Sequence, residues 1–159
     1  MMNMKKIVVW CVGNPLMRDD GVGPALFSEL ASEPMEHLEP VDCETTPENW
    51  IARLRQSPPE VLLVADAADM GLPGGSIRKM SLADTGNISF SSHGMPLSLL
   101  LEPFRNKIEI AVIAVQPLER GFGEELSPSA AEAVRRLSQI LRSGRFEELE
   151  CYQEKRSPR

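Results

Sequence analysis

The sequence predicts an α/β fold, a three-layer α/β/α sandwich in which helices cover both faces of a mostly parallel sheet. Three apolar runs rich in β-branched residues, at residues 6–12, 61–65 and 108–115, show no alternation with polar residues. Such runs are typical of parallel strands that are covered on both faces. Helical segments lie between the runs, and strands that alternate with helices form a parallel sheet through right-handed crossovers.

Two further strands and four helices complete the prediction. A shorter strand is expected at residues 38–42. Residues 76–80 alternate apolar and polar side chains, which suits an antiparallel edge strand exposed on one side. The four helices are expected at residues 24–31, 47–56, 96–104 and 128–141. Each of these segments begins with a proline. Proline lacks a backbone N–H, and it is tolerated at a helix start because the first N–H groups of a helix have no intrahelical partner. Apolar residues form one stripe in the last two helices, so each has a face to bury.

Length and composition indicate one globular domain. The chain has 159 residues, of which 42% are hydrophobic and 25% charged, which is enough to build a single core. We expect this domain to span residues 1–145. After Gly144 the chain is charged and contains proline, so residues 146–159 are expected to form a disordered tail.

Charge and cysteine content exclude several classes of function. The net charge of −6 argues against nucleic acid or anionic lipid as a partner, since both require clustered Lys and Arg. The apolar run at residues 7–12 is too short for a membrane helix and lacks a signal-peptide cleavage site. The three cysteines form no CxxC pair, so neither a disulfide framework nor a thiolate zinc site is encoded. We therefore expect a cytoplasmic protein in which the cysteines are small hydrophobic residues or bystanders. We also expect a monomer.

Carboxylates follow two of the predicted strands. Ligands of open α/β sheets bind beyond the carboxyl ends of the parallel strands, where this chain places Asp19 and Asp20 after the first strand and Asp66 after the 61–65 strand. Helix capping is the favoured interpretation of Asp19. For Asp20, capping and function remain equally open, and for Asp66 an Asx turn is as good an explanation as function. Asp69 is interpreted as part of an exposed turn.

The two histidines differ in context. His37 lies in a polar stretch that is interpreted as a surface loop, and we expect no function for it. His93 ends a loop of about a dozen residues, long enough to suggest function, and precedes a predicted helix. The partial positive charge of a helix start disfavours imidazolium and keeps a ring nitrogen free to bind a metal. Considered alone, a histidine in this position is more often a cap or a core residue than a ligand.

Together, Asp20, Asp66 and His93 supply two carboxylates and one imidazole from three loops. This donor set suits a divalent transition metal with open coordination positions. A carboxylate pair acting without the histidine would instead suit acid–base hydrolysis. Residue spacing leaves both chemistries open. The glycines at positions 13, 21 and 23 match neither a dinucleotide fingerprint nor a P-loop, so phosphate binding is not favoured.

Five short motifs add a family resemblance to this interpretation. They are Val12-Gly13-Asn14 with Asp19-Asp20-Gly21, then Val41-Asp42, Ala65-Asp66-Ala67, Ser92-His93 and Gln116-Pro117. In order and spacing, across about residues 6–145, they resemble the hydrogenase maturation endopeptidases. Residues 66–71 and the Gln116-Pro117 pair are most similar to the branch that serves formate-linked hydrogenases, the hydrogenase 3 branch.

The resemblance implies a fold, an activity and a set of site residues. The implied fold is a mixed five-stranded sheet flanked by helices, of the phosphorylase/hydrolase-like kind. The implied activity is removal of the C-terminal extension from a nickel-iron hydrogenase large-subunit precursor. Asp20, Asp66 and His93 would contact nickel that the substrate supplies and that the protease does not bind permanently. Cleavage would then depend on prior nickel insertion.

One departure from the family pattern concerns the loop after the second strand. Many relatives have Asp-Gly-Gly there, whereas this chain has Asp42-Cys43-Glu44. It stays open whether Asp42 orients a metal ligand from a second shell or only ends its strand. Two other classes of function were weighed: a non-catalytic α/β module that binds a metal or small ligand, and a nucleotide-binding domain. Turnover of a precursor distinguishes a protease from either.

Overall fold

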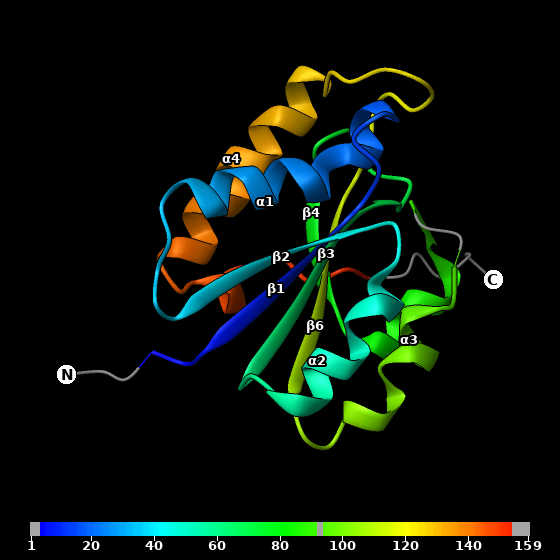
Figure 1. Ribbon diagram of the computed structural model, residues 1–159. Coiled ribbons are helices and arrows are strands. Elements are labelled where there is room, and N and C mark those ends of the chain that lie inside the picture. Colours follow the sequence, from blue (N-terminus) through cyan, green and yellow to red (C-terminus); the bar gives the residue numbers. More distant parts are fainter. Residues whose placement is uncertain (1–3, 92–93, 154–159) are drawn as a thin grey trace.

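A computed structural model describes residues 4–91 and 94–153 and has the expected three layers (Figure 1). The sheet order is β2-β1-β3-β6-β4. Four strands are parallel: β1 (Ile7–Val12), β2 (Leu38–Glu44), β3 (Val61–Asp69) and β6 (Glu109–Val115). The edge strand β4 (Ile77–Met80) runs antiparallel to β6. The predicted fold class, including the antiparallel edge strand, is confirmed.

A sixth strand was not predicted. The two-residue β5 (Ser89–Phe90) pairs antiparallel with the end of β3, where Ala68 is opposite Phe90. Two residues are too few to show a period in the sequence. This pairing extends β3 beyond its expected end at residue 65, because β3 gains a partner on the side where β1 has already ended.

Helices cover both faces of the sheet. Figure 1 shows α1 (Val22–Ser32) and α4 (Pro128–Arg142) on one face, and α2 (Ile51–Gln56) and α3 (Leu97–Leu100) on the other. Five 3-10 turns complete the described elements: η1 (Arg18–Gly21), η2 (Pro47–Trp50), η3 (Leu82–Asn87), η4 (Glu102–Phe104) and η5 (Phe146–Glu148).

Two of the four predicted helices are divided. Residues 47–56 begin as η2 before becoming α2, and residues 96–104 divide into α3 and η4. Pro103 lies in the first turn of η4. Proline lacks an N–H and its ring clashes with the preceding turn, so the α-helix that contains Leu97 cannot continue through that position.

The central strand β1 contributes to two hydrophobic cores. All six of its residues are buried. Val9 and Cys11 pack in the same core as Leu26 of α1 and Leu137 of α4. Trp10 packs in the other core, with Leu54 of α2 and Leu101. Burial on both faces explains why the sequence of this strand does not alternate.

The cysteines behave largely as the sequence indicates. Cys11 and Cys43 are buried free thiols, and Cys151 is an exposed free thiol. Burial, with smaller contributions from the neighbouring thiol and from Asp42, raises the pKa of the Cys11 thiol well above its usual range. Burial and Asp42 do the same for Cys43. The two buried thiols are therefore neutral at physiological pH and pack as small hydrophobic side chains.

The expectation of a disordered tail is wrong for residues 146–153. Phe146 and Leu149 are buried in the core on the α1/α4 face. The backbone of the same segment pairs with the free edge of β4, where the Lys79 N–H donates to the Glu150 carbonyl and the Tyr152 N–H to the Lys79 carbonyl, each at 2.9 Å. The segment is held in place because it pairs with an unpaired strand edge and buries two apolar side chains. Its charged composition does not show either interaction. Residues 154–159 lie outside the described residues.

The part of the chain that the structure describes contains no candidate for a membrane-spanning helix. Within residues 4–91 and 94–153, no helix combines the length and the apolar character needed to cross a bilayer.

Candidate active site

Two of the three predicted site residues lie together at the carboxyl edge of the sheet. Asp20 belongs to η1, directly after β1, and Asp66 belongs to the adjacent strand β3. They are close enough for the charge of Asp20 to raise the pKa of Asp66. Asp66 does not end its strand, as expected, but lies inside β3. It is the first residue beyond the point where β1 stops pairing at Ala65, which opens one side of it toward Asp20.

The Asp66 carboxyl is buried and only 2% exposed. Burial raises its pKa to about 8, and the charge of Asp20 contributes to the increase. Hydrogen bonds from the Ser91 hydroxyl and from the backbone of Ala67 oppose the shift but do not reverse it. Among the described residues, no Lys or Arg forms an ion pair with Asp66. A buried carboxyl without a cationic partner has the environment of a functional group and suits a bound cation.

A pocket of about 260 Å³ opens beside Asp66. It is lined by residues from the ends of β1 and β3, from β5 and from the start of α3, among them Val12, Asp66, Phe90, Gly94, Pro96 and Leu97. The buried carboxyl is therefore reachable from solvent on this side. Asp66 is the charged residue in the lining of this pocket.

Asp20 has a cationic partner that the sequence analysis missed. The Nε of Arg120 donates to Asp20 Oδ1 at 3.0 Å, and the Asp20 side chain is 15% exposed. Arg120 lies in the loop after β6, at the same sheet edge as the other two loops. The signal in the sequence was its position: Arg120 lies four residues after Gln116, in a third loop at the carboxyl edge of the sheet, where ligands of such sheets bind.

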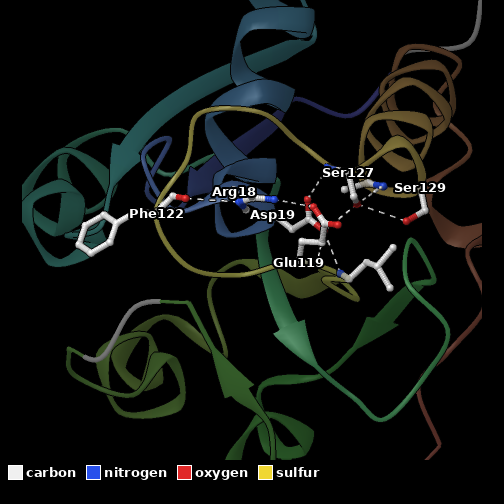
Figure 2. A network of polar contacts seen from close by, with 8 residues as sticks. Arg18, Asp19, Glu119, Phe122, Ser127 and Ser129 are labelled. Atoms are coloured by element: carbon white, nitrogen blue, oxygen red, sulfur yellow. Dashed lines mark hydrogen bonds and ion pairs between the residues drawn. The ribbon is translucent and has the colours of Figure 1, made fainter.

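Asp19 is an anchor for the loop between β6 and α4, and its interpretation as a helix cap is wrong. No side chain caps η1 or α1. Figure 2 shows the Asp19 carboxylate pointing away from α1 toward Ser127. Oδ2 accepts from the N–H groups of Leu118 and Glu119 at 2.8 and 2.9 Å and from Ser127 Oγ at 2.7 Å. Oδ1 accepts from the Ser127 N–H at 2.7 Å.

The four hydrogen bonds decide the ionisation of Asp19. Burial by itself would raise the pKa of this carboxyl. The N–H groups of Glu119, Ser127 and Leu118, together with the Ser127 hydroxyl, lower it below the usual value. A carboxylate with four donors is fully satisfied as an anion. Asp19 therefore supports the site structurally and has no acceptor capacity left for a metal.

The loop after β3 is held by Gln116, a residue of the motifs quoted above. Its Oε1 accepts from the Met70 N–H at 2.6 Å, and its Nε2 donates to Asp69 Oδ1 at 3.2 Å. The Asp69 side chain also accepts from the Gly71 N–H at 3.1 Å. The hydrogen bonds from Gly71 and Gln116, and then the charge of Arg120, lower the pKa of Asp69. The exposure expected of Asp69 is confirmed, but the residue is the last of β3, where it is opposite Ser89, and is not itself a turn residue.

His93, the third predicted site residue, lies outside the described residues. On one side of it, Ser91 donates to Asp66, and on the other, Gly94 lines the pocket beside Asp66. Among residues 4–91 and 94–153, no three His, Cys, Asp or Glu side chains gather at one point. The other histidine, His37, makes no described contact with this site, and its Nε2 has no hydrogen-bond partner in the described part of the chain.

The Asp42-Cys43-Glu44 segment keeps a backbone conformation that favours glycine. Glu44 has a φ of +53°, in the left-handed region that side chains disfavour. Asp42 Oδ1 accepts from the Glu44 N–H at 3.1 Å and thereby closes an Asx turn. Asp42 does not end its strand, because β2 continues to Glu44 and Asp42 is opposite Cys11 of β1. That Asp42 orients a metal ligand stays a prediction.

Comparison with known proteins adds the family. A family model described as hydrogenase maturation protease matches residues 24–143. The chain belongs to the hydrogenase maturation proteases. It is 35% identical over 136 residues to the hydrogenase 3 maturation protease of Escherichia coli, a match that covers 84% of this chain and 87% of that protein. The resemblance stated from the motifs is confirmed, and this maturation protease is a peptidase.

Solved structures agree with this membership. The solution structure of the E. coli endopeptidase HycI has a TM-score of 0.85 and 31% identity to this maturation protease, and the match covers 96% of this chain and 99% of that one. A maturation protease HycI from Thermococcus kodakarensis has a TM-score of 0.79 at 23% identity, with 89% and 92% covered. At that identity the second likeness supports the fold alone.

Proposed function

We propose that this protease removes the C-terminal extension of a nickel-iron hydrogenase large-subunit precursor after nickel has been inserted. In this proposal the nickel belongs to the substrate, and Asp20, Asp66 and His93 contact it through its open coordination positions. The observation that carries the proposal is the Asp66 carboxyl, which is buried, lacks a described cationic partner and is electrostatically coupled to Asp20.

The donor chemistry fits a divalent transition metal. Two carboxylates and one imidazole form a hard-to-borderline set that suits such an ion with positions left open. The positions of Ser91 and Gly94 beside the Asp66 pocket support the inclusion of His93. Docking on the precursor's nickel orients the scissile peptide. Bound nickel would supply Lewis-acid polarisation of the scissile carbonyl, and a carboxylate of the site, Asp20 or Asp66, would guide the attacking water.

The surface around the site supports a protein substrate over a small ligand. Among the described residues, six large hydrophobic side chains are exposed, and five of them lie in loops or in α3 at the site end of the sheet. These five are Leu16, Met95, Leu99, Leu118 and Phe122. Exposed apolar side chains gathered around a site are typical of a protein interface, whereas a module for a small ligand needs no such surface.

The two other classes of function have weaker support. A non-catalytic binding module would share Asp20 and Asp66 but does not account for membership in a peptidase family. A nucleotide-binding domain would use the glycine-rich loop to hold phosphate. Here Gly13 is required by close packing, because a Cβ at that position would lie 2.2 Å from the Asp20 carbonyl oxygen. We place the reaction in the cytoplasm and assign it to a monomer.

A processing assay tests the proposal. A large-subunit precursor of a formate-linked hydrogenase is incubated, with and without bound nickel, with the wild type, Asp20→Asn or His93→Ala. We expect the wild type to shorten only the nickel-loaded precursor and both variants to leave it intact. Arg135→Gln is a matched surface control, because Arg135 lies on the exposed side of α4 and, among the described residues, pairs only with Glu132. Cleavage of nickel-free precursor, or full activity of Asp20→Asn, would contradict the assignment.

A further inference from the structure

In the free protein, a guanidinium occupies the place beside Asp20 where the charge of a metal would act. Arg120 Nε lies 3.0 Å from Asp20 Oδ1, and the two side chains are 36% and 15% exposed. The pair is thus partly screened from water. A divalent ion that approaches Asp20 must displace this cation or bind next to it.

Arg120 is held at this place by the residues that precede it. Arg18 Nη1 pairs with Glu119 Oε2 at 2.8 Å. The Asp19 N–H donates to the Glu119 carbonyl at 3.0 Å, while Asp19 Oδ2 accepts from the Leu118 and Glu119 N–H groups. Residues 18–20 therefore contact residues 118–120 one after another. Figure 2 shows the first two steps of this series around Asp19 and Glu119.

The anchoring distinguishes Arg120 from an ordinary surface cation. An exposed arginine loses conformational entropy when it forms an ion pair, and many such pairs contribute little. Here the backbone that carries Arg120 is fixed directly after Glu119 by a buried carboxylate. The entropy loss is correspondingly smaller, and the guanidinium remains beside Asp20 whenever no stronger cation replaces it.

We propose that Arg120 is a specificity residue, which lowers the affinity of the free protease for metal ions in solution and so reserves the site for nickel carried by the precursor. A free ion gains only its bonds to the site and must overcome the repulsion of the guanidinium. A docked precursor gains further contacts across the interface, which offset the displacement of Arg120. Discrimination through an unfavourable interaction with the wrong ligand is a general route to specificity. This inference rests on the proposed function of the site.

Calorimetric titration with NiCl2 tests the inference without any cleavage. We expect Arg120→Gln to bind free Ni²⁺ about tenfold more tightly than the wild type, since a unit charge near a divalent ion acts on this scale at a partly exposed site. Arg120→Lys retains the charge and should stay near the wild-type affinity. Asp20→Asn/Arg120→Gln should lose the gain, because the ion then lacks its carboxylate. Arg135→Gln serves as the surface control.

The outcomes separate this inference from the proposed function. If Arg120→Gln is folded, as judged by circular dichroism, and binds Ni²⁺ no more tightly than the wild type, Arg120 is a structural ion pair and the inference is overturned. That result leaves nickel-dependent processing by the wild type unaffected. If the wild type processes nickel-free precursor, the proposed function fails by its own assay. A second readout supports the inference when free Ni²⁺ inhibits processing by Arg120→Gln at about tenfold lower concentration than it inhibits the wild type.

Discussion

The carboxylates of Asp19 and Asp20 are adjacent in the chain and bind opposite kinds of partner. Asp19 is fully buried and accepts four hydrogen bonds from residues 118, 119 and 127. Asp20 instead contacts the guanidinium of Arg120. One carboxylate thus fixes the loop, and the other forms an ion pair with a partly exposed arginine.

This division predicts that two matched substitutions lower stability by unequal amounts. Asp19→Asn should lower the free energy of unfolding by roughly 3 kcal/mol, because an amide cannot satisfy four buried donors. Asp20→Asn should lower it by less than about 1 kcal/mol, since it loses one partly exposed ion pair. Urea unfolding monitored by circular dichroism measures both. Equal losses for the two variants would contradict the separate roles.

The lowered pKa of Asp19 also predicts a sensitivity to acid. A carboxyl whose pKa is lower in the folded state stabilises the protein above its unfolded pKa, about 3.9, and this contribution is lost as the pH falls through the folded pKa. We therefore expect the wild type to lose stability below about pH 4. Asp19→Asn should show a shallower loss over that range. Thermal melts from pH 2 to pH 6 test this prediction.

Asp66 predicts the opposite dependence at higher pH. Its pKa of about 8 in the folded state lies above the unfolded value. The folded state therefore binds more protons between these pKa values, and stability falls as the pH rises from about 4 to 8. Asp66→Asn removes the ionisable group and should increase the free energy of unfolding by roughly 2 kcal/mol at pH 8. The gain should shrink as the pH falls and be smallest near pH 4, because the Asp66 carboxyl is then increasingly protonated in the unfolded state as well.

Processing gives Asp66→Asn a second, independent readout. We expect the more stable variant to be inactive toward nickel-loaded precursor, because the neutral amide is a poor metal ligand. A gain in stability combined with a loss of activity is typical of a functional residue. A variant that was both less stable and active would indicate a structural role for Asp66.

Phe122 provides a test of substrate docking. Its ring is 88% exposed and points away from the Asp19 network (Figure 2), while its carbonyl accepts from Arg18 Nε at 3.3 Å. Phe122→Ser should therefore change stability by less than about 0.5 kcal/mol and raise the KM for precursor about tenfold, as loss of an aromatic anchor does. Met4→Ser is the control, because Met4 is also exposed but lies at the N-terminal end of the chain. Equal KM values for the two variants would exclude a docking role for Phe122.

Glu44 and Arg18 have the same unusual backbone conformation and should respond differently to glycine. Their φ values are +53° and +48°. Glu44→Gly relieves the backbone strain and removes only an exposed side chain. The net increase in the free energy of unfolding should be about 0.5 kcal/mol once the entropy cost of glycine is subtracted. Arg18→Gly relieves the same strain but loses the contacts to Glu119 and Phe122, so stability should fall. Chemical denaturation of both variants measures the difference.

Much of the fold was readable from local patterns. The unbroken apolar runs predicted β1, β3 and β6, because a strand covered on both faces leaves no room for polar side chains. Alternation predicted the edge strand β4. The failures have equally specific causes. Residues 146–153 are charged in sequence, but two apolar side chains and a free strand edge hold them in place.

The sequence by itself determined the layers, the order of elements and the edge of the sheet at which Asp20 and Asp66 would meet, since strand period and strand order depend on neighbouring residues. Only the tertiary structure decided that Asp19 anchors a loop, that Arg120 pairs with Asp20 and that Ser91 contacts Asp66. These contacts join residues 25 to 108 positions apart. Their geometry depends on how the loops close over the finished sheet, and no local period records that.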